Sequence, residues 1–344
     1  MKNIQIYVTA LLTIIGVKAF AQDVHFSQLQ NTPLLQNPSF AGNSGGDIRA
    51  VVNYRSQWGS LTSSPFESIG ANIDLRFKDT PLNESHLAGG LSMYTDVAGA
   101  SQMRTTVVIF TIATHVKINK NNFISAGLQG GIYQKSLDYS DLRFDNQFHG
   151  TGHNSALDSY EGLGSISEIS PTISGGVSYM WTDLLDNSTK GGKKINVGFA
   201  VHHYNGPRYY TVSSEDVALK YIASFSGSFA ASNSSWLIQP AAYFAFQNQA
   251  SDFVFGSVFN YDLDGGSKSF NKTSSIGFGM YYRVADAFIP TVQVQWDSFV
   301  MGLSYDINTS KLTEASSSRG GFEISLKFIS QNSTLGNSAR NRFF

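Results

Sequence analysis

Hydrophobic and polar residues alternate one by one along most of this chain. In the stretch that begins at Asp47, one set of alternate positions is apolar, namely Ile48, Ala50, Val52 and Tyr54. The positions between them include the polar residues Arg49, Asn53, Arg55 and Gln57. Successive side chains of a β-strand point to opposite faces, so this strand has one apolar face and one polar face. An apolar outer face and a polar inner face are typical of a strand in a membrane β-barrel.

The same alternation recurs as far as the end of the chain. Turn residues divide the sequence into about fourteen such strands, each close to the ~9–11 residues that cross a membrane at a tilt. The predicted ranges are 47–56, 66–77, 87–96, 103–117, 122–135, 170–182, 193–205, 218–230, 236–247, 252–262, 274–284, 287–296, 299–306 and 319–330. We therefore predict an all-β fold, a transmembrane antiparallel β-barrel of about 14 strands, with 12 or 16 strands as alternatives.

An even number of strands places both ends of the barrel on the periplasmic side and makes every odd-numbered connection an external loop. The longest connection, residues 136–169, is then external. It contains the aromatic residues Phe144, Phe148 and Tyr160. A long polar loop with aromatic side chains is suited to fold over the barrel mouth or to receive a partner.

The first residues have the parts of a secretory signal peptide. Lys2 provides a positive charge, residues 4–17 form an apolar core, and Ala19-Phe20-Ala21 provides the cleavage pattern before Gln22. The following stretch is polar, contains prolines and has no sustained period, which predicts an extended arm in the periplasm or in the barrel lumen. The predicted division is a signal peptide at 1–21, an N-terminal periplasmic or lumenal arm at 22–46, the outer-membrane barrel at 47–330 and a periplasmic tail at 331–344.

Composition supports a membrane barrel over a secreted β-sandwich or propeller, which would also show alternating strands. Charged residues make up 14% of the chain, against about 25% in ordinary soluble domains. Aromatic residues make up 13%, and several stand near predicted strand ends, as interfacial aromatic girdles do. The chain has no cysteine, so no disulfide stabilises it. Its net charge of −1 argues against nucleic acid as a partner.

No motif commits the chain to catalysis, and we predict neither an enzyme nor a cofactor or metal site. His202 and His203 are adjacent, so they are predicted to point to opposite faces of a strand, which disfavours a shared metal. His149 and His153 lie in the long loop. Histidines in such a loop are more often ordinary solvated polar residues than ligands of a metal site.

The predicted lumen carries the polar and charged residues Arg49, Asn53, Asp74 and Arg76. These side chains could form a filter for solutes or an internal lattice of ion pairs. A lattice is favoured, because charges in a narrow lumen need partners to offset their desolvation.

Several stretches of the sequence resemble a known protein family. The stretch QDVHFSQLQNTPLLQNPSFAG at 22–42 and the stretch RAVVNYRSQW at 49–58 resemble the PorP/SprF family of outer-membrane proteins in the type IX secretion system of Bacteroidetes. Further similar runs are YTDVAG at 94–99, LRFDNQF at 142–148, VGFAVHHYNGP at 197–207 and GFEISLKF at 321–328. The resemblance makes these residues candidates for family motifs or partner contacts: Asp23, His25, Phe26, Ser27, Gln28, Asn37, Pro38, Gly42, Arg55, Gln57, Trp58, Phe144 and Phe148.

This resemblance implies a non-enzymatic component of the type IX secretion system in the outer membrane. Its implied role is to assist export or cell-surface attachment of secreted cargo, including gliding-motility adhesins with a type B C-terminal sorting domain. The implied partners are the sorting domain of the cargo, other secretion components such as periplasmic ring proteins, and outer-membrane lipid. Two hypotheses follow.

The first hypothesis is a protein-binding barrel that engages cargo through the loops 136–169 and 206–217. The second is a passive diffusion porin, which the polar inner face suggests. Conductance across a planar bilayer separates the two.

Overall fold

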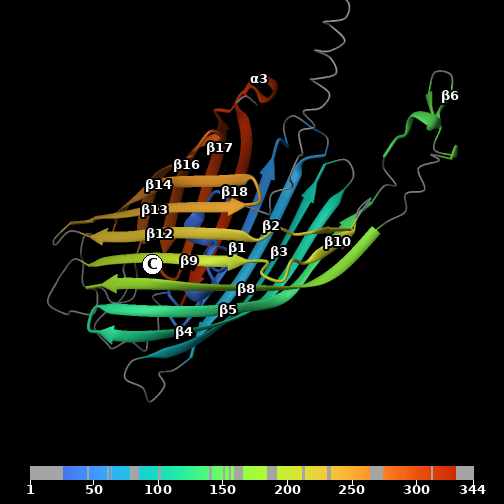
Figure 1. Cartoon of the computed structure of the whole chain (residues 1–344). Helices are drawn as coiled ribbons and strands as arrows, with labels where there is room; N and C mark the ends of the chain where they lie inside the picture. Colours follow the sequence, from blue (N-terminus) through green and yellow to red (C-terminus); the bar gives the residue numbers. More distant parts are fainter. Residues whose placement is uncertain are drawn as a thin grey trace, which may run out of the picture.

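Fourteen antiparallel strands close into a single barrel. The computed structural model describes residues 26–330 except 45, 60–61, 63, 78–84, 100–101, 139–141, 150–151, 155, 159–165, 184–191, 211–213, 231–233, 264–273 and 311–312. Figure 1 shows the strands running side by side around the barrel wall. The predicted antiparallel barrel and its number of strands are confirmed.

Each barrel strand pairs with its neighbours in chain order, and the first strand pairs with the last. Arg49 stands opposite Ile329 and Arg55 stands opposite Glu323 in the pair that closes the barrel. The strands are β1 (Ile48–Gln57), β2 (Phe66–Arg76), β3 (His86–Ala98), β4 (Met103–Asn119), β5 (Asn122–Leu137), β8 (Ile166–Thr182), β9 (Lys193–His202), β12 (Lys220–Ala230), β13 (Trp236–Gln247), β14 (Ala250–Asp262), β15 (Ser274–Arg283), β16 (Ala287–Trp296), β17 (Phe299–Asn308) and β18 (Arg319–Ile329).

The outer surface of the barrel is apolar. Along β2, exposed Ile69, Ile73 and Leu75 alternate with buried Ser68 and Asp74. On β4 and β5 the exposed fractions reach 65% for Phe110 and 70% for Ile112 and Leu128. An apolar belt of this extent suits contact with lipid and would be unfavourable in water. In the described part of the chain, no helix is long and apolar enough to cross a membrane.

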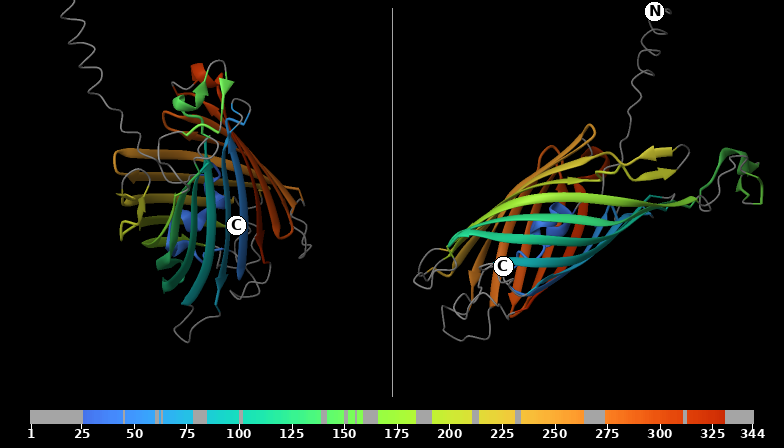
Figure 2. Two further views of the ribbon diagram at one scale, coloured as in Figure 1. Left: turned by 90° about the vertical axis from the view of Figure 1, so that its right-hand side faces the viewer. Right: turned by 60° about the horizontal axis from the view of Figure 1, so that its bottom comes forward.

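The two ends of the barrel differ in their connections. We call the end where β1 begins and β18 ends the terminal end, and the opposite end the far end. The far end carries the longer described insertions (Figures 1 and 2). These are η3 (Asp145–Gln147), the hairpin of β6 (Phe148–His149) and β7 (Gly152–His153), the hairpin of β10 (Arg208–Tyr210) and β11 (Ser214–Asp216), and α3 (Thr313–Ser316).

Two features differ from the sequence expectation. The connection predicted at 136–169 is shorter, because β5 continues to Leu137 and β8 already begins at Ile166. The arm is not extended: it contains the short helices η1 (Leu29–Asn31), α2 (Pro33–Gln36) and η2 (Pro38–Phe40). Prolines and local hydrogen bonds set the turns of the arm, and such turns produce no regular alternation of apolar and polar residues in the sequence. The predicted signal peptide, the tail and the positions of both chain termini lie outside the described residues.

Candidate functional site

Residues 26–44, which we call the lumen segment, lie inside the barrel (Figure 2, right). Pro33 and Pro38 each occupy the first turn of a short helix, where the missing N–H of proline costs nothing. The side chain of Asn37 accepts a hydrogen bond from the N–H of Ser39 and so caps η2. Ser27, Asn37, Ser39 and Ala41 have no exposed surface. A polar segment that is buried in this way must satisfy its hydrogen bonds on the barrel wall.

Near the far end, the lumen segment is bound by two carboxylates. The backbone N–H of Ser27 donates to Glu323 Oε2 at 2.6 Å, and the N–H of Gln28 donates to Glu323 Oε1 at 3.2 Å. The Ser27 hydroxyl donates to Asp306 Oδ1 at 2.8 Å. Hydrogen bonds to a charged acceptor are stronger than neutral ones, contributing about 1.5–3 kcal/mol each. These contacts fix the start of the described chain to β17 and β18.

Two arginines complete this far-end cluster. Arg55 Nη2 lies 2.8 Å from Asp306 Oδ2, and Arg283 Nη1 lies 3.0 Å from the same oxygen. Arg283 Nη2 also donates to the Ser27 hydroxyl at 2.8 Å. The hydroxyl of Ser27 therefore stands between a carboxylate and a guanidinium. Buried charges need this degree of hydrogen bonding to offset their desolvation.

The amide of Gln28 extends the contact along β18. Its Nε2 donates to the carbonyl of Glu323 at 3.1 Å, and its Oε1 accepts from the Ser325 hydroxyl at 2.6 Å. Asn31 Nδ2 donates to the same Oε1 at 2.8 Å and to Ser325 Oγ at 2.8 Å. The first helical turn is thus held by side-chain amides against one strand.

Asn37 holds the middle of the lumen segment to the opposite wall. Its Nδ2 donates to the carbonyl of Val177 on β8 at 3.0 Å and to the carbonyl of Phe199 on β9 at 3.2 Å. The part of the barrel wall beside Asn37 and Ser39 contains the glycines Gly176 and Gly127. A Cβ placed on Gly176 would lie 2.9 Å from Asn37 Cγ, and one on Gly127 would lie 2.5 Å from the backbone N of Ser39. Only glycine lets the segment approach the strands this closely.

At the terminal end, Asp74 and Arg49 hold the last turn of the lumen segment. Gly42, in a left-handed conformation at φ 67°, donates its N–H to Asp74 Oδ2 at 2.7 Å. Arg49 pairs with Asp74 at 2.8 Å and donates to the carbonyl of Phe40 at 2.9 Å. His115 Nε2 lies 2.6 Å from the carbonyl oxygen of Ala41. Both ends of the segment are therefore bound to inward charged or polar side chains.

The structure brings most of the candidate motif residues into the lumen. Phe26, Ser27, Gln28, Asn37, Pro38, Gly42 and Arg55 belong to the buried segment or its wall. The candidate lumen residues Arg49, Asn53 and Asp74 are buried on the inner face and Arg76 is half-buried. Asp23 and His25 lie outside the described residues.

The remaining candidates lie away from the lumen segment. Gln57 ends β1, and Trp58 follows it and packs edge-on against Phe66 with ring centroids 5.0 Å apart. Phe144 precedes η3 and its N–H donates to Gln147 Oε1 at 3.1 Å. Phe148, on the β6–β7 hairpin, is 53% exposed. These aromatic residues belong to the far end of the barrel.

Sequence patterns do not identify the wall residues that bind the lumen segment. Asp306, Arg283 and Gln129 stand in predicted strands without a distinguishing motif, and Glu323 stands within the run GFEISLKF at 321–328. Gln129 Nε2 donates to the carbonyl of Leu34 at 2.9 Å. A usable signal existed: each is a polar residue on the inner face of a strand whose outer face is apolar.

The prediction that His202 and His203 point to opposite faces is wrong. Both side chains are buried. β9 ends at His202, and His203 adopts a left-handed conformation at φ 59°, which turns its ring back inward. His203 Nδ1 lies 3.1 Å from the Thr172 hydroxyl, and His202 Nε2 lies 3.3 Å from the carbonyl of Gln36. Within the described residues, no group of three or more potential ligands is placed to hold a metal ion.

Comparison with known proteins finds a match to a family profile and similarities in fold to solved structures. The profile of the family described as "Type IX secretion system membrane protein PorP/SprF" matches residues 18–328. No curated protein matches the chain.

Among solved structures, the CymD monoaromatic hydrocarbon channel is 10% identical with a TM-score of 0.44, covering 88% of this chain and 93% of that one. A deletion mutant of the TodX monoaromatic hydrocarbon channel is 10% identical with a TM-score of 0.46, covering 86% and 92%. The β domain of the Bordetella autotransporter BrkA is 8% identical with a TM-score of 0.42, covering 83% and 99%.

Proposed function

Because this chain belongs to the PorP/SprF family of type IX secretion system membrane proteins, we propose that it is a closed outer-membrane barrel that binds secreted cargo. In this proposal the barrel assists export of a protein with a C-terminal sorting domain, or keeps that protein attached at the cell surface. Gliding-motility adhesins with a type B sorting domain are the cargo class that the family resemblance implies.

The observation that carries the proposal is the lumen segment, which is bound inside the barrel. Residues 26–44 are bound along the lumen by Glu323 and Asp306 toward one end and by Asp74 toward the other. A barrel whose lumen is occupied by its own chain is poorly suited to let solutes diffuse through. The surfaces at the two ends of the barrel remain available for protein contacts. We therefore prefer a role in protein binding to a role as a diffusion porin.

The far end offers contacts for cargo. It carries the β6–β7 and β10–β11 hairpins, and Phe148 on the first of these is 53% exposed. Exposed aromatic side chains are enriched at the centres of protein interfaces. We assign this end to the cell surface and the terminal end to the periplasm, where other secretion components, such as the ring proteins, would meet the barrel.

Surface display of cargo tests the proposal. In cells that lack this protein, a secreted protein with the sorting domain should no longer stay at the surface. Deleting residues 143–165 should leave an inserted barrel that no longer holds the cargo, and Phe148→Ala should weaken display. Leu263→Ala is the matched control, because Leu263 is similarly exposed, at 58%, in the connection after β14 at the terminal end. Unchanged display in the deletion variant would contradict the proposal.

A further inference from the structure

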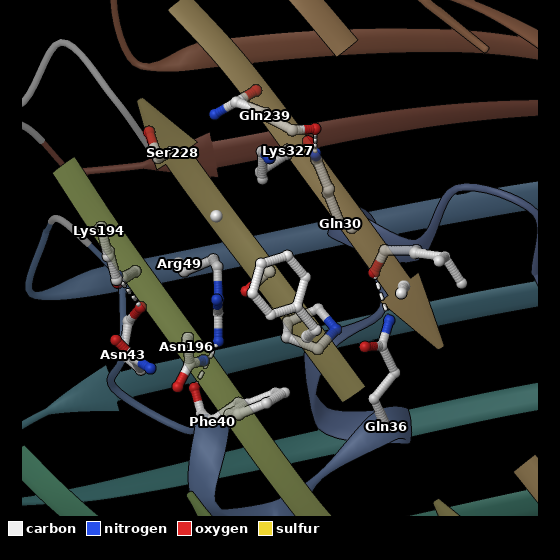
Figure 3. A pocket seen from close by; sticks show the side chains of 18 of the residues that line it. Gln30, Gln36, Phe40, Asn43, Arg49, Lys194, Asn196, Ser228, Gln239 and Lys327 are labelled. Atoms are coloured by element: carbon white, nitrogen blue, oxygen red, sulfur yellow. Dashed lines mark hydrogen bonds between the residues drawn. The ribbon is translucent and has the colours of Figure 1, made fainter. Parts of the chain in front are cut away.

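A cavity of about 140 Å³ lies between the lumen segment and the barrel wall (Figure 3). Its lining includes Gln30 and Phe40 of the segment, Asn196 on β9, Ser228 on β12 and Gln239 on β13. Lys194, at the start of β9, and Ile329, at the end of β18, also line it, so the cavity lies at the terminal end. One water needs about 10–15 Å³. The cavity therefore has room for a side chain with part of its backbone.

Three cationic side chains line this cavity, and its lining contains no carboxylate. Arg49 is paired with Asp74 behind the cavity at 2.8 Å. Lys194 Nζ donates to the carbonyl of Asn43 at 3.3 Å. Lys327 is only 6% exposed and, in the part of the chain that the structure describes, makes no ion pair. A buried ammonium without a counter-charge favours the binding of an anion.

Two unpartnered polar atoms provide a second observation. The Asn196 Oδ1 and Ser228 Oγ atoms are buried without a hydrogen-bond partner among the described residues. The residues Asn196 and Ser228 are 6% and 7% exposed. Strand register places Lys194 opposite Ser228. The hydroxyl can donate to a carboxylate, and the amide oxygen can accept from a peptide N–H.

The barrel wall beside the cavity is formed by continuously paired strands. β9 pairs continuously with β12 beside Lys194, and β18 pairs with β1 beside Lys327. A lipid in the bilayer would have to cross this hydrogen-bonded wall. A chain that enters the lumen along the barrel axis from the terminal end does not have to cross this wall.

We propose that this cavity binds an acidic side chain of a polypeptide that enters the barrel from its terminal end. The carboxylate would be bound by Lys194 and Lys327, and the adjoining peptide group would meet Asn196. This inference rests on the proposed function, in which the terminal end faces periplasmic secretion partners. It adds the chemical class of the partner segment, which is acidic.

Binding of a fluorescent peptide, Gly-Asp-Asp-Gly, to the detergent-solubilised full-length protein tests the inference. Lys327→Met and Lys194→Met should each weaken binding about tenfold, by removing one charge from a poorly solvated site. Lys327→Arg should retain binding. Lys193→Met is the matched control, since the neighbouring Lys193 is exposed and lies outside the lining. A gel shift on heating establishes that each variant has a folded barrel.

Equal binding of Gly-Asn-Asn-Gly, with the same amidated C-terminus as the acidic peptide, would overturn the inference, as would unchanged peptide binding by both methionine variants. Binding of inorganic phosphate without any binding of the acidic peptide would also overturn it, because the site would then recognise a free anion. Peptide binding and cargo display are measured separately. Loss of display without the protein, together with no peptide binding, removes only this inference and leaves the proposed function standing.

Discussion

The backbone N–H of Ser27 donates a 2.6 Å hydrogen bond to Glu323, which lies 296 positions further along the chain. Glu323 also stands opposite Arg55 in the strand pair that closes the barrel. The lumen segment can therefore dock on this residue only once β18 has been placed. The position of Ser27 thus depends on the last strand of the barrel.

Replacing Glu323 should release the lumen segment. The change Glu323→Ala removes a buried acceptor of two backbone N–H groups, and each such bond contributes about 1.5–3 kcal/mol. Thr32→Cys provides the readout, because Thr32 is buried and the chain has no cysteine of its own. We expect maleimide to label this cysteine at least about tenfold faster when Glu323 is replaced by Ala. Glu323→Gln, which keeps one acceptor oxygen, should have a smaller effect; equal labelling in all three backgrounds would contradict the assigned contact.

Asn37→Asp should be as disruptive as Asn37→Ala, although Asp has nearly the shape of Asn. The amide Nδ2 donates to two carbonyl oxygens, and a carboxylate would place a buried negative charge against both. Loss of a buried partner costs about 1–3 kcal/mol. The same cysteine labelling measures the effect. Asn43→Ala, at a half-buried position of the same segment, is the control for Asn37→Ala and should leave labelling unchanged.

Gly127→Ala should displace the lumen segment without unfolding the barrel. The new Cβ would lie 2.5 Å from the backbone N of Ser39. A side chain could relieve such a clash by changing its rotamer, but a backbone atom cannot. Gly130 lies on the same strand and its Cβ would meet nothing within 4 Å, so Gly130→Ala is the matched control. Fast labelling of Thr32→Cys is expected with the first change only. Slow labelling with both would show that the wall does not constrain the segment.

Removing one partner of the terminal-end ion pair should lower stability. In Asp74→Ala, Arg49 keeps its charge while its side chain is only 9% exposed, and breaking a buried pair in this way costs about 3–5 kcal/mol. The double change Asp74→Ala with Arg49→Met should recover part of this loss, because it removes the unpaired charge of Arg49. Urea unfolding of the reconstituted barrel measures the difference. A double variant that is less stable than Asp74→Ala would contradict this explanation.

The strands were predictable because lipid on one side and a polar lumen on the other impose a period of two on the sequence. Positions such as Ile69 and Asp74 carry that period directly, and strand bounds such as 236–247 and 287–296 follow from it. The lumen segment carries no period. Its polar residues face distant strands in every direction, so the sequence around Asn37 does not reveal that β8 and β9 bind it.

The contacts between the segment and the wall could not be predicted for the same reason. The pairing of Ser27 with Asp306 and Glu323 depends on how the closed barrel sets its register, which local patterns do not specify. At His203 the prediction from alternation fails locally. Simple alternation puts this side chain on the outer face, whereas its left-handed backbone places it on the inner face beside His202.

Conductance across a planar bilayer tests the central claim most directly, namely that residues 26–44 close the lumen. The intact protein should show no stable open channel, whereas a variant that lacks residues 26–44 and still forms a heat-modifiable barrel should conduct in steady steps. Stable open channels from the intact protein, of the same size as those of the deletion variant, would contradict the claim and favour a diffusion porin.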